Sequence, residues 1–365
     1  MRDKCPVSYT SNNDGHFTVA RYDDVRNGLS DWETFSSAQG IMTPRFKEHL
    51  TLIEMDPPEA KFWRNLVQKD LTEKAVGERY SDSIREDVNH LLDDLSDRQT
   101  FDLVTEFAEL LPVLVVGTVI GARSRGRELR DLTLQITANQ SDPERIAEIA
   151  GQMSMILIEE IKVRESKPGD DLLSRYAKLR IDGEPLPLEK LLMFVQVLIL
   201  AGNTTTVSGL SAMLKYLLSD EQLRLRVLED PATLNSAIDE SLRLSPPLLH
   251  FARTTTRETE IRGQRIGAGE SVVFVYASGN MDPEEFPNPE EFRLDRPNRH
   301  LSFGWGIHRC VGSHLAKLEI RIAVQELFRR FPDIELAIPS DHIFAHVHGG
   351  NEMKYASLPV KRRGH

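Results

Sequence analysis

The sequence predicts a mainly helical fold of the α-rich α+β class, with small β-sheets. Apolar residues recur at three- and four-residue spacing over residues 57–174, and helical patterns continue over residues 187–244. Strand-like pieces follow, and a last amphipathic run covers residues 313–331. Long helices followed by a few short strands are typical of one α-rich domain, so we expect residues 1–365 to form a single domain.

The individual elements follow from local patterns. Residues 17–20 predict a short strand, and residues 22–29 predict a short helix that leads into a turn containing Trp32 and Phe35. Residues 282–297 contain four prolines among many acids and predict an irregular meander. The later strands are expected at residues 251–255, 259–261 and 271–275.

Composition narrows the classes of protein. A hydrophobic content of 40% and a charged content of 28% are typical of a soluble globular chain. The net charge of -11 argues against nucleic acid as a partner. Cys5 and Cys310 cannot form a disulfide framework, which fits a reducing compartment, and the first residues show no apolar leader. We therefore expect a cytoplasmic protein with no membrane partner.

One long uncharged stretch, residues 191–214, requires a choice between a membrane span and a buried helix. Its centre, residues 202–206, is polar, and polar groups are costly in lipid. We therefore favour a long helix inside a large soluble domain. Such a helix would measure about 45 Å if it spanned thirty residues.

Cys310 is the residue with the strongest chemical signal. It lies in the glycine-rich stretch 303–312, which leads into the last amphipathic run. Backbone N–H groups converge at the start of a helix, where the helix dipole favours an anion such as a thiolate. Glycines allow the backbone to pass close to a flat ligand. The alternative is an ordinary buried cysteine.

The pattern Phe303-x-x-Gly306-x-His308-x-Cys310-x-Gly312 resembles the haem-ligating signature of the cytochrome P450 family. The resemblance covers the chain from about residue 6 onward and is closest to the soluble bacterial members. It implies a long central helix over haem b, with Cys310 as the iron ligand and with Phe303, Gly304 and Gly312 as cofactor contacts. Relatives carry a further helix before the first strand, so we expect that this element is lacking or that the start is truncated.

A second segment resembles the oxygen-binding part of that family. Ala201 and Gly202 would leave room for O2 and contact the cofactor, while Asn203, Thr204 and Thr205 are the catalytic candidates. Thr205 stands at the position of the proton-relaying alcohol. Thr204 replaces the usual acid, and a threonine cannot supply a proton as a carboxyl group does. The alternative is three threonines that merely pack within a helix.

Further matches concern charged residues. The resemblance implies that Arg64, Arg253 and His308 contact the haem propionates, for which arginine's planar fork is well suited. Ala60 departs from the pattern, because relatives often have histidine there. A buried structural network is expected from Glu240, Arg243 and Arg296. Taken alone, each of these charges could instead be an ordinary surface residue.

Substrate contacts are placed by the same resemblance, and the alternative for each is a role in the core. They are mostly apolar and imply a small lipophilic substrate. The candidates are Ile41, Met42, Leu198, Ala201, Leu248, Leu249, Phe251, His346 and His348. His346 and His348, with His342, could also form a metal site, but no carboxylate or thiol nearby would complete it.

These features predict a haem-thiolate monooxygenase that activates O2 and oxidises a small lipophilic molecule, for example in secondary metabolism. The sequence shows no flavin or nicotinamide motif, so electrons would come from a ferredoxin or flavodoxin with its NAD(P)H-dependent reductase. Arg309, Lys317 and Arg321 are the candidate docking residues. We expect a monomer. The alternatives are a peroxide-driven or atypical oxidation such as coupling or dehydration, and a non-catalytic haem-binding protein.

Overall fold

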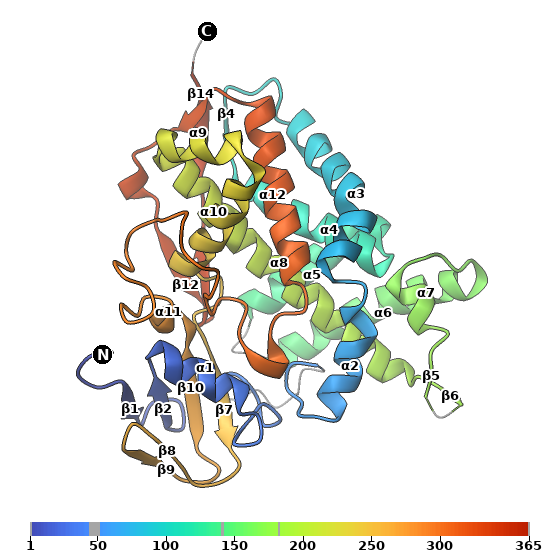
Figure 1. Cartoon of the computed structure of the whole chain (residues 1–365). Helices are drawn as coiled ribbons and strands as arrows, with labels where there is room; N and C mark the ends of the chain where they lie inside the picture. Colours follow the sequence, from blue (N-terminus) through green and yellow to red (C-terminus); the bar gives the residue numbers. More distant parts are fainter. Residues whose placement is uncertain (1, 44–51, 140–141, 182, 364–365) are drawn as a thin grey trace. The chain divides into compact units, whose positions relative to one another are not determined.

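The computed structural model describes residues 2–43, 52–139, 142–181 and 183–363, and the chain divides into two compact units. The first unit contains Met1–Gln68, Ala212–Ser313 and Ala345–Lys354. The second contains Lys69–Ser211, His314–Phe344 and Tyr355–His365. Each unit is therefore assembled from segments that are distant in sequence. Helices dominate the described structure, and the strands form small sheets (Figure 1).

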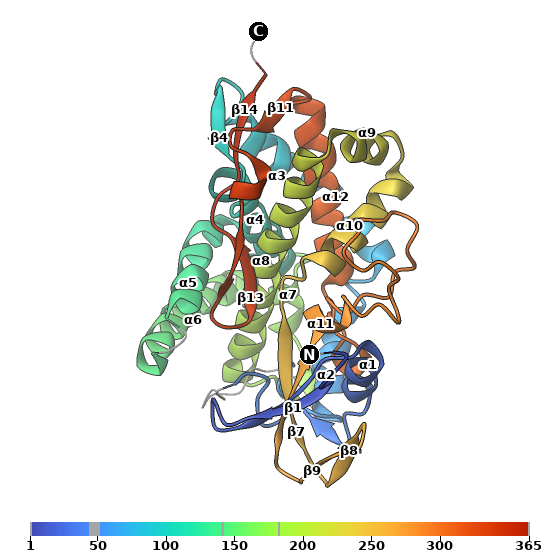
Figure 2. The same cartoon turned by 90° about the vertical axis from the view of Figure 1, so that its left-hand side faces the viewer.

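A five-stranded sheet is the main β element of the first unit. Its strand order is β1-β2-β10-β7-β3. The β2–β10 pair is parallel, whereas the other three neighbouring pairs are antiparallel. Strands β1, β2, β10 and β7 lie together in Figure 1, and β1 and β7 are seen together again in Figure 2. Their bounds are β1 Val7–Thr10, β2 His16–Val19, β3 Phe35–Ser36, β7 His250–Thr255 and β10 Ser271–Val275.

Helix α1, Tyr22–Ser30, packs against this sheet and encloses the core of the first unit. The approach is close, because a Cβ added at Gly28 would lie 2.2 Å from the ring of Phe274. Phe274 in turn meets Phe35 edge to face, with ring centroids 5.2 Å apart. The fully buried members of this core include Val19, Val25, Leu29, Val272, Phe274 and Leu301.

The remaining elements of the first unit surround the sheet. Asp220 and Asp230 cap α9 and α10, because their side chains accept the N–H groups of Leu223 and Ala232. The segment that follows α11 has no helix or strand until residue 306, as the four prolines predicted for the meander. The bounds are α2 Glu59–Gln68, α9 Glu221–Glu229, α10 Pro231–Leu244, α11 Tyr276–Gly279, β8 Thr259–Ile261, β9 Gln264–Ile266, β12 Ala345–His348 and β13 Glu352–Tyr355.

The second unit is mostly helical. A three-stranded sheet, β11-β14-β4, and the β5–β6 hairpin complete it. The helices are α3 Glu73–Asp93, α4 Leu111–Ile120, α5 Gly126–Ala138, α6 Pro143–Ser166, α7 Leu172–Tyr176, α8 Leu188–Ser219 and α12 Ser313–Arg330. The strands are β4 Thr100–Asp102, β5 Arg180–Ile181, β6 Glu184–Pro185, β11 Ile334–Leu336 and β14 Pro359–Arg362.

Helix α8 has 32 residues and contains the long uncharged stretch. By length and composition it could cross a membrane, and it is the single helix of the described residues that passes this test. However, 56% of its apolar window is buried inside the structure. This burial, together with the polar residues near its centre, supports the predicted core helix. Most of α8 lies in the second unit, and its last turns lie in the first.

The structure corrects several local expectations. The helical pattern expected over residues 57–174 is interrupted by β4 and by a π-helical turn at Val104–Ala108. Strand β4 pairs with β14, whose residues lie about 260 positions later, so local periodicity could not reveal it. Phe35, expected in a turn, begins β3 and pairs with Thr255.

Candidate functional site

The loop that carries Cys310 is held by its own backbone. The N–H of Cys310 donates to the carbonyl of Phe303 at 2.7 Å. A short 3-10 turn, Gly306–His308, lies between these two residues. Gly304 and Gly306 have φ angles of 65° and 69°, which L side chains rarely adopt. The glycines therefore permit the tight path that brings Cys310 to the start of α12.

Gly306 also allows the loop to approach α1 closely. A Cβ added at Gly306 would lie 2.5 Å from the carbonyl oxygen of Leu29. Beside this contact, the guanidinium of Arg26 lies 4.9 Å from the ring centroid of Trp305, within the range of a cation–π interaction. The loop therefore packs against α1, the first helix of the same unit.

The thiol of Cys310 receives backbone N–H groups at the beginning of α12. Gly312 and Ser313 donate to it, as expected at a helix N-terminus. The side chain is accessible to solvent, yet the protein around it removes much of its water. This desolvation raises the pKa of the thiol, against the opposing effects of the N–H groups, Arg64 and Arg309. Without a metal the sulfur is therefore protonated at neutral pH, whereas a bound metal would deprotonate it.

Three basic side chains gather beside this loop: Arg64 from α2, Arg253 from β7 and His308. Burial, assisted by the two guanidinium groups, lowers the pKa of His308 to about 3, so its ring is neutral. The ring bonds to the backbone of Met55, while its Nε2 atom is buried without a hydrogen-bond partner. Burial also lowers the pKa of Arg64.

The arginines of this group lack the carboxylates that buried arginines normally require. Arg253 is 4% exposed, donates to the carbonyl of Ala252 at 2.7 Å and bonds to the hydroxyl of Tyr276. Within the described residues, no carboxylate pairs with Arg64 or Arg253. Two uncompensated guanidinium groups and an unpartnered imidazole nitrogen, next to a thiol, fit a metal-containing group that carries two carboxylates.

Ala60 is buried on α2 and offers no polar group at the position where relatives often have histidine. Trp63, almost fully buried on the same helix, packs edge to face against Phe62.

Gly312, predicted as a cofactor contact, has open space on its Cβ side, because an added Cβ would have no neighbour within 4 Å. Phe303 is half-buried.

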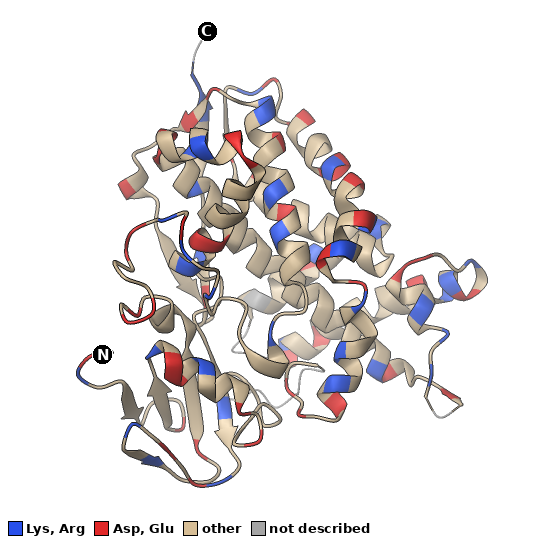
Figure 3. Ribbon diagram, viewed as in Figure 1, with Lys and Arg blue, Asp and Glu red and all other residues tan. Residues whose placement is uncertain are grey.

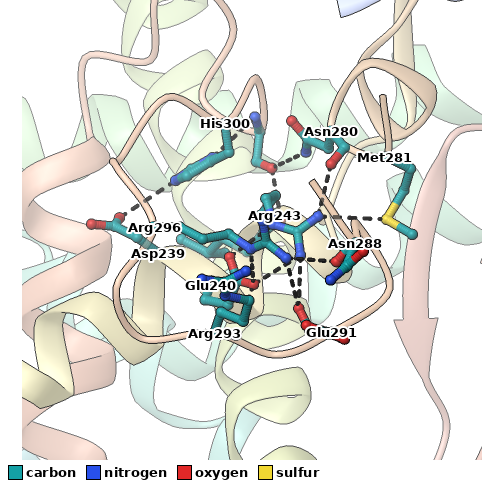
Figure 4. A network of polar contacts seen from close by, with 12 residues as sticks. Asp239, Glu240, Arg243, Asn280, Met281, Asn288, Glu291, Arg293, Arg296 and His300 are labelled. Carbon is teal, nitrogen blue, oxygen red and sulfur yellow. Dashed lines mark hydrogen bonds and ion pairs between the residues drawn. The ribbon is translucent and has the colours of Figure 1, made fainter. Parts of the chain in front are cut away.

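The predicted structural network is present and fully paired (Figure 4). Arg243 binds both carboxylate oxygens of Glu240, each at 2.8 Å, and Arg296 binds the same carboxylate at 2.9 Å. The three side chains are 2%, 3% and 7% exposed. The remaining guanidinium N–H groups donate to backbone carbonyls, namely those of Asn280, Pro287, Asn288 and Glu291.

The catalytic candidates lie on the second-unit part of α8. The hydroxyl of Thr205 donates to the carbonyl of Ala201 at 2.8 Å, and that of Thr206 donates to Gly202 at 3.2 Å. Such bonds to the preceding turn can bend a helix. Thr204 makes no side-chain hydrogen bond with the described residues. Asn203 is 2% exposed and its Nδ2 atom is buried without a partner.

Gly202 is required for packing within the second unit, because an added Cβ would lie 2.8 Å from Cγ2 of Val116. Cys310 belongs to the first unit, and the α8 candidates belong to the second. The roles of Ala201, Asn203, Thr204 and Thr205 therefore rest on the sequence resemblance. Leu198, the other substrate candidate of this helix, is half-buried.

The substrate candidates of the first unit are brought together from three segments. The amide of Ala252 donates to the carbonyl of Ile41 at 2.7 Å, which joins the first segment to β7. The amide of Leu249 donates to the carbonyl of Asn351 at 2.9 Å, which joins β7 to the β12–β13 hairpin. Ile41 is buried, whereas Met42, Leu248, Leu249 and Phe251 are half-buried and thus partly available for contact.

His346 and His348 lie two residues apart on β12, where His346 is exposed and His348 is half-buried. Around them the described residues contain no group of three or more histidine, cysteine, aspartate or glutamate side chains that could hold a metal ion. The metal-site alternative thus gains no support from the described geometry. A location on the hairpin that meets residues 248–249 is compatible with the substrate role.

The predicted docking residues differ in their surroundings. Arg309 is exposed, whereas Lys317 and Arg321 are half-buried and lie one turn apart on α12. Both signs of charge occur along this helix (Figure 3). Arg309 belongs to the first unit, whereas Lys317 and Arg321 belong to the second.

Sequence reasoning missed several residues that shape the site. Tyr276 orients Arg253, and Asn351 links the hairpin to β7. The buried carboxylate of Glu54 accepts the N–H of Ile41 at 3.0 Å, and the backbone of Met55 binds His308. Glu54 and Met55 directly precede the Asp-Pro-Pro turn at residues 56–58. This turn was the sequence feature that could have indicated a functional loop.

Comparisons with known proteins agree with this geometry. Residues 129–336 match the family model described as Cytochrome P450. The chain is 32% identical over 363 residues to "Cytochrome P450 109" of Bacillus spizizenii, covering 94% of this chain and 88% of the relative. It is 31% identical to a "Steroid C26-monooxygenase" of Mycobacterium tuberculosis, covering 92% of this chain and 91% of the relative.

A solved structure gives the same result for the fold. The crystal structure of CYP109E1 from Bacillus megaterium in complex with testosterone matches with a TM-score of 0.88 and 28% identity, and the match covers 100% of this chain and 98% of that one. The predicted mainly helical fold with small sheets is thereby confirmed. Sequence, fold and relatives agree, and the chain belongs to the cytochrome P450 family of monooxygenases.

Proposed function

We propose that this monooxygenase binds haem b through Cys310 and uses it to oxidise a small lipophilic substrate. The observation that carries the proposal is the pair of guanidinium groups without a carboxylate partner, Arg64 and Arg253, beside His308 and a thiol in the same unit. When bound, a haem held by the Cys310 thiolate would supply the chemistry of O2 activation.

The residues of the first unit have distinct roles in this proposal. The N–H groups of Gly312 and Ser313 stabilise the thiolate of Cys310. Arg64 and Arg253 would bind the two propionates as charge-assisted donors. The free Nε2 of His308 would join them only after its ring takes up a proton, which a nearby propionate favours. Phe303 and Gly304 shape the loop that would contact the cofactor. Glu240, Arg243 and Arg296 hold the meander and take no part in the reaction.

From the sequence resemblance, Ala201 and Gly202 on α8 would contact the cofactor and leave room for O2. Thr205 would hold a proton at Oγ1 for the reaction, and its hydroxyl donates to the carbonyl of Ala201 at 2.8 Å. Thr204 cannot supply a proton itself, so Asn203 or an ordered water must assist. The unpartnered Nδ2 of Asn203 supports this, because buried amides normally have a partner.

The proposed setting is a cytoplasmic monomer that folds as one P450 domain. The apolar candidates Met42, Leu249 and Phe251, with Leu198 on α8, favour a lipophilic substrate. Two relatives point to steroid-sized molecules, since one is named a steroid monooxygenase and another was crystallised with testosterone.

Electrons would come from a ferredoxin or flavodoxin that is reduced by an NAD(P)H-dependent reductase. We propose that Arg309, Lys317 and Arg321 contribute to docking. Reversing these charges should slow ferredoxin-driven turnover at low salt and flatten its dependence on ionic strength. Unchanged turnover and an unchanged salt dependence would remove these residues from the docking surface.

The decisive test of haem binding compares the two cysteines. Each variant, Cys310→Ala and the control Cys5→Ala, is purified from cultures supplied with δ-aminolaevulinate. We expect Cys5→Ala to keep the haem absorption and the thiolate-type CO difference spectrum, because Cys5 lies at the surface. Cys310→Ala should lose the thiolate-type spectrum. If the wild type is colourless, or if Cys310→Ala has an unchanged spectrum, the proposal fails.

A second candidate reaction uses hydrogen peroxide in place of O2 and electrons. It is favoured by Thr204, which has no carboxyl group and no side-chain hydrogen bond to the described residues. Thr204→Glu should increase product formed per NADPH consumed if O2 is the oxidant, and Thr205→Ala should decrease it. If both variants leave this coupling unchanged while peroxide alone supports turnover, the peroxide reaction is the correct one.

A further inference from the structure

Asn351, in the turn between β12 and β13, contacts three segments that carry substrate candidates. It is 4% exposed, and each of its side-chain polar atoms is used. Its Oδ1 accepts the N–H of His250 at 3.4 Å, and its Nδ2 donates to Sδ of Met42 at 3.4 Å. Its backbone carbonyl accepts the N–H of Leu249 at 2.9 Å. One residue thus joins positions 42, 249 and 250 to the hairpin, all within the first unit.

Backbone bonds surround this residue and hold the same segments. The N–H of Met353 donates to the carbonyl of Pro247 at 2.9 Å, and Leu248 forms a bridge with Glu352. On the other side of Asn351, its own N–H donates to the carbonyl of His348 at 3.3 Å. These bonds would form with most side chains at these positions. The connection to Met42, in contrast, requires the amide group of Asn351.

We infer that Asn351 is a specificity-determining positioning residue, which sets how the Met42 segment, the start of β7 and the β12–β13 hairpin lie around the substrate. The inference rests on the proposed function, because that proposal makes these segments substrate contacts. Asn351 acts through Met42 and Leu249 and does not itself react with the substrate.

The chemistry of the amide explains why asparagine is needed. A buried carboxamide can donate and accept at once, which the contacts with Met42 and His250 require. Leucine has a similar volume but offers neither group and would leave the His250 N–H without its side-chain acceptor. Aspartate keeps the acceptor, loses the donor and places a carboxylate next to the Met42 sulfur. The hairpin should therefore shift in both variants, with a different geometry in each.

The test uses haem ligands that need no knowledge of the natural substrate. Imidazole binds iron through nitrogen and is small, whereas 4-phenylimidazole binds in the same way and extends its ring toward the lining segments. In Asn351→Leu and Asn351→Asp we expect the dissociation constant of 4-phenylimidazole to rise about tenfold, because the displaced segments would fit its larger ring less well. The constant for imidazole should change less than about twofold.

Asn27→Leu is the matched control, because Asn27 is an exposed asparagine of the first unit on α1. It should bind both ligands as the wild type does. Hydrogen exchange without any ligand gives a second readout. The amides of Leu249, His250 and Met353 should exchange faster in both Asn351 variants and not in Asn27→Leu.

A variant that folds poorly does not end the test, since Met42→Leu removes the sulfur from the other side of the same contact. It should weaken 4-phenylimidazole binding, and combining it with Asn351→Asp should add less than the sum of the two effects. The inference is overturned if the ratio of the two ligand constants stays at the wild-type value, or if the combined effects are additive. A wild type that binds neither ligand would instead refute the proposed haem site.

Discussion

Two groups of arginines in the first unit differ in how their charges are compensated. Arg243 and Arg296 share the carboxylate of Glu240 and donate their remaining N–H groups to backbone carbonyls. Arg64 and Arg253 have no carboxylate among the described residues. A buried charge without a counterion is costly, so a protein retains one where a ligand provides the counterion. All charges of the first group are paired within the protein, whereas the second group leaves guanidinium charge for the haem propionates that we propose.

The largest effect is expected from removing the shared carboxylate. Glu240→Ala leaves the guanidinium groups of Arg243 and Arg296 buried without a counterion. We expect the free energy of unfolding in urea to fall by about 3–5 kcal/mol. Asp295→Ala is the control, because Asp295 pairs with Arg293 at the surface and should change stability little. A small loss in Glu240→Ala would show that the network is not essential to the fold.

The opposite effect on stability is expected for Arg64 and Arg253, which have no carboxylate partner among the described residues. Arg253→Met removes a 4% exposed charge that has no carboxylate partner. The apoprotein should keep or gain stability, while the affinity for haem should fall on the order of tenfold to a hundredfold through the loss of one charge-assisted contact. Haem transfer to apomyoglobin measures the affinity, and urea unfolding measures the stability. An apoprotein that is strongly destabilised by Arg253→Met would remove the distinction between the two groups.

Two buried acidic residues of the second unit, Asp87 and Glu319, allow the same comparison for negative charges. Burial raises the pKa of Asp87 to about 6, although Arg123 opposes this shift. Burial, with Asp87 as a further cause, raises the pKa of Glu319 well above its usual range, and its Oε2 has no partner. Raised acid pKa values mean that the folded state holds protons that the unfolded chain has released. Stability therefore falls as pH rises through about 4 to 6 and beyond.

Glu319→Gln removes the contribution of this carboxyl group to the pH dependence. The free energy of unfolding at pH 7 should rise on the order of 1 kcal/mol. Chemical unfolding at several pH values between about 5 and 8 is the measurement. Glu335→Gln is the control of opposite sign, because Arg363 and Lys361 lower the pKa of Glu335. Its removal should lower stability above about pH 4.5. A Glu319→Gln protein with the wild-type pH profile would contradict the assignment.

The smallest effect concerns the orientation of Arg253. Tyr276→Phe removes the hydroxyl that bonds to this arginine, while the buried ring and its packing against Phe251 remain. We expect haem affinity to fall about threefold to tenfold, less than in Arg253→Met, with a stability change within about 1 kcal/mol. Equal losses of haem affinity in the two variants would mean that Tyr276 controls the whole contact.

Local patterns were sufficient for elements that are defined by near neighbours. The periodicity around α1 and α12, the strand-like runs of β7 and β10, and the prolines of the meander each predicted the observed structure. The signature around Cys310 placed the loop, because its glycines have a direct conformational reason. The spacing of Glu240 and Arg243 on one helix face also predicted their contact.

What the sequence did not reveal depends on partners far along the chain. Strand β4 exists because β14 pairs with it, and Tyr276 and Asn351 matter because folding places them beside Arg253 and Met42. None of these residues has a local motif. The lack of counterions around Arg253 was equally invisible, because it can be recognised only when the surroundings of the side chain are known.

The close approach of Gly306 to the carbonyl of Leu29 has a practical consequence for protein engineering. The backbones of the cysteine loop and of α1 pack directly against each other. Replacing only one of these two segments with that of a homologue would therefore disturb their contact. A chimaera that transplants residues 303–312 should also carry residues 22–30 of the same donor. The unit to transplant therefore consists of two segments that are distant in sequence.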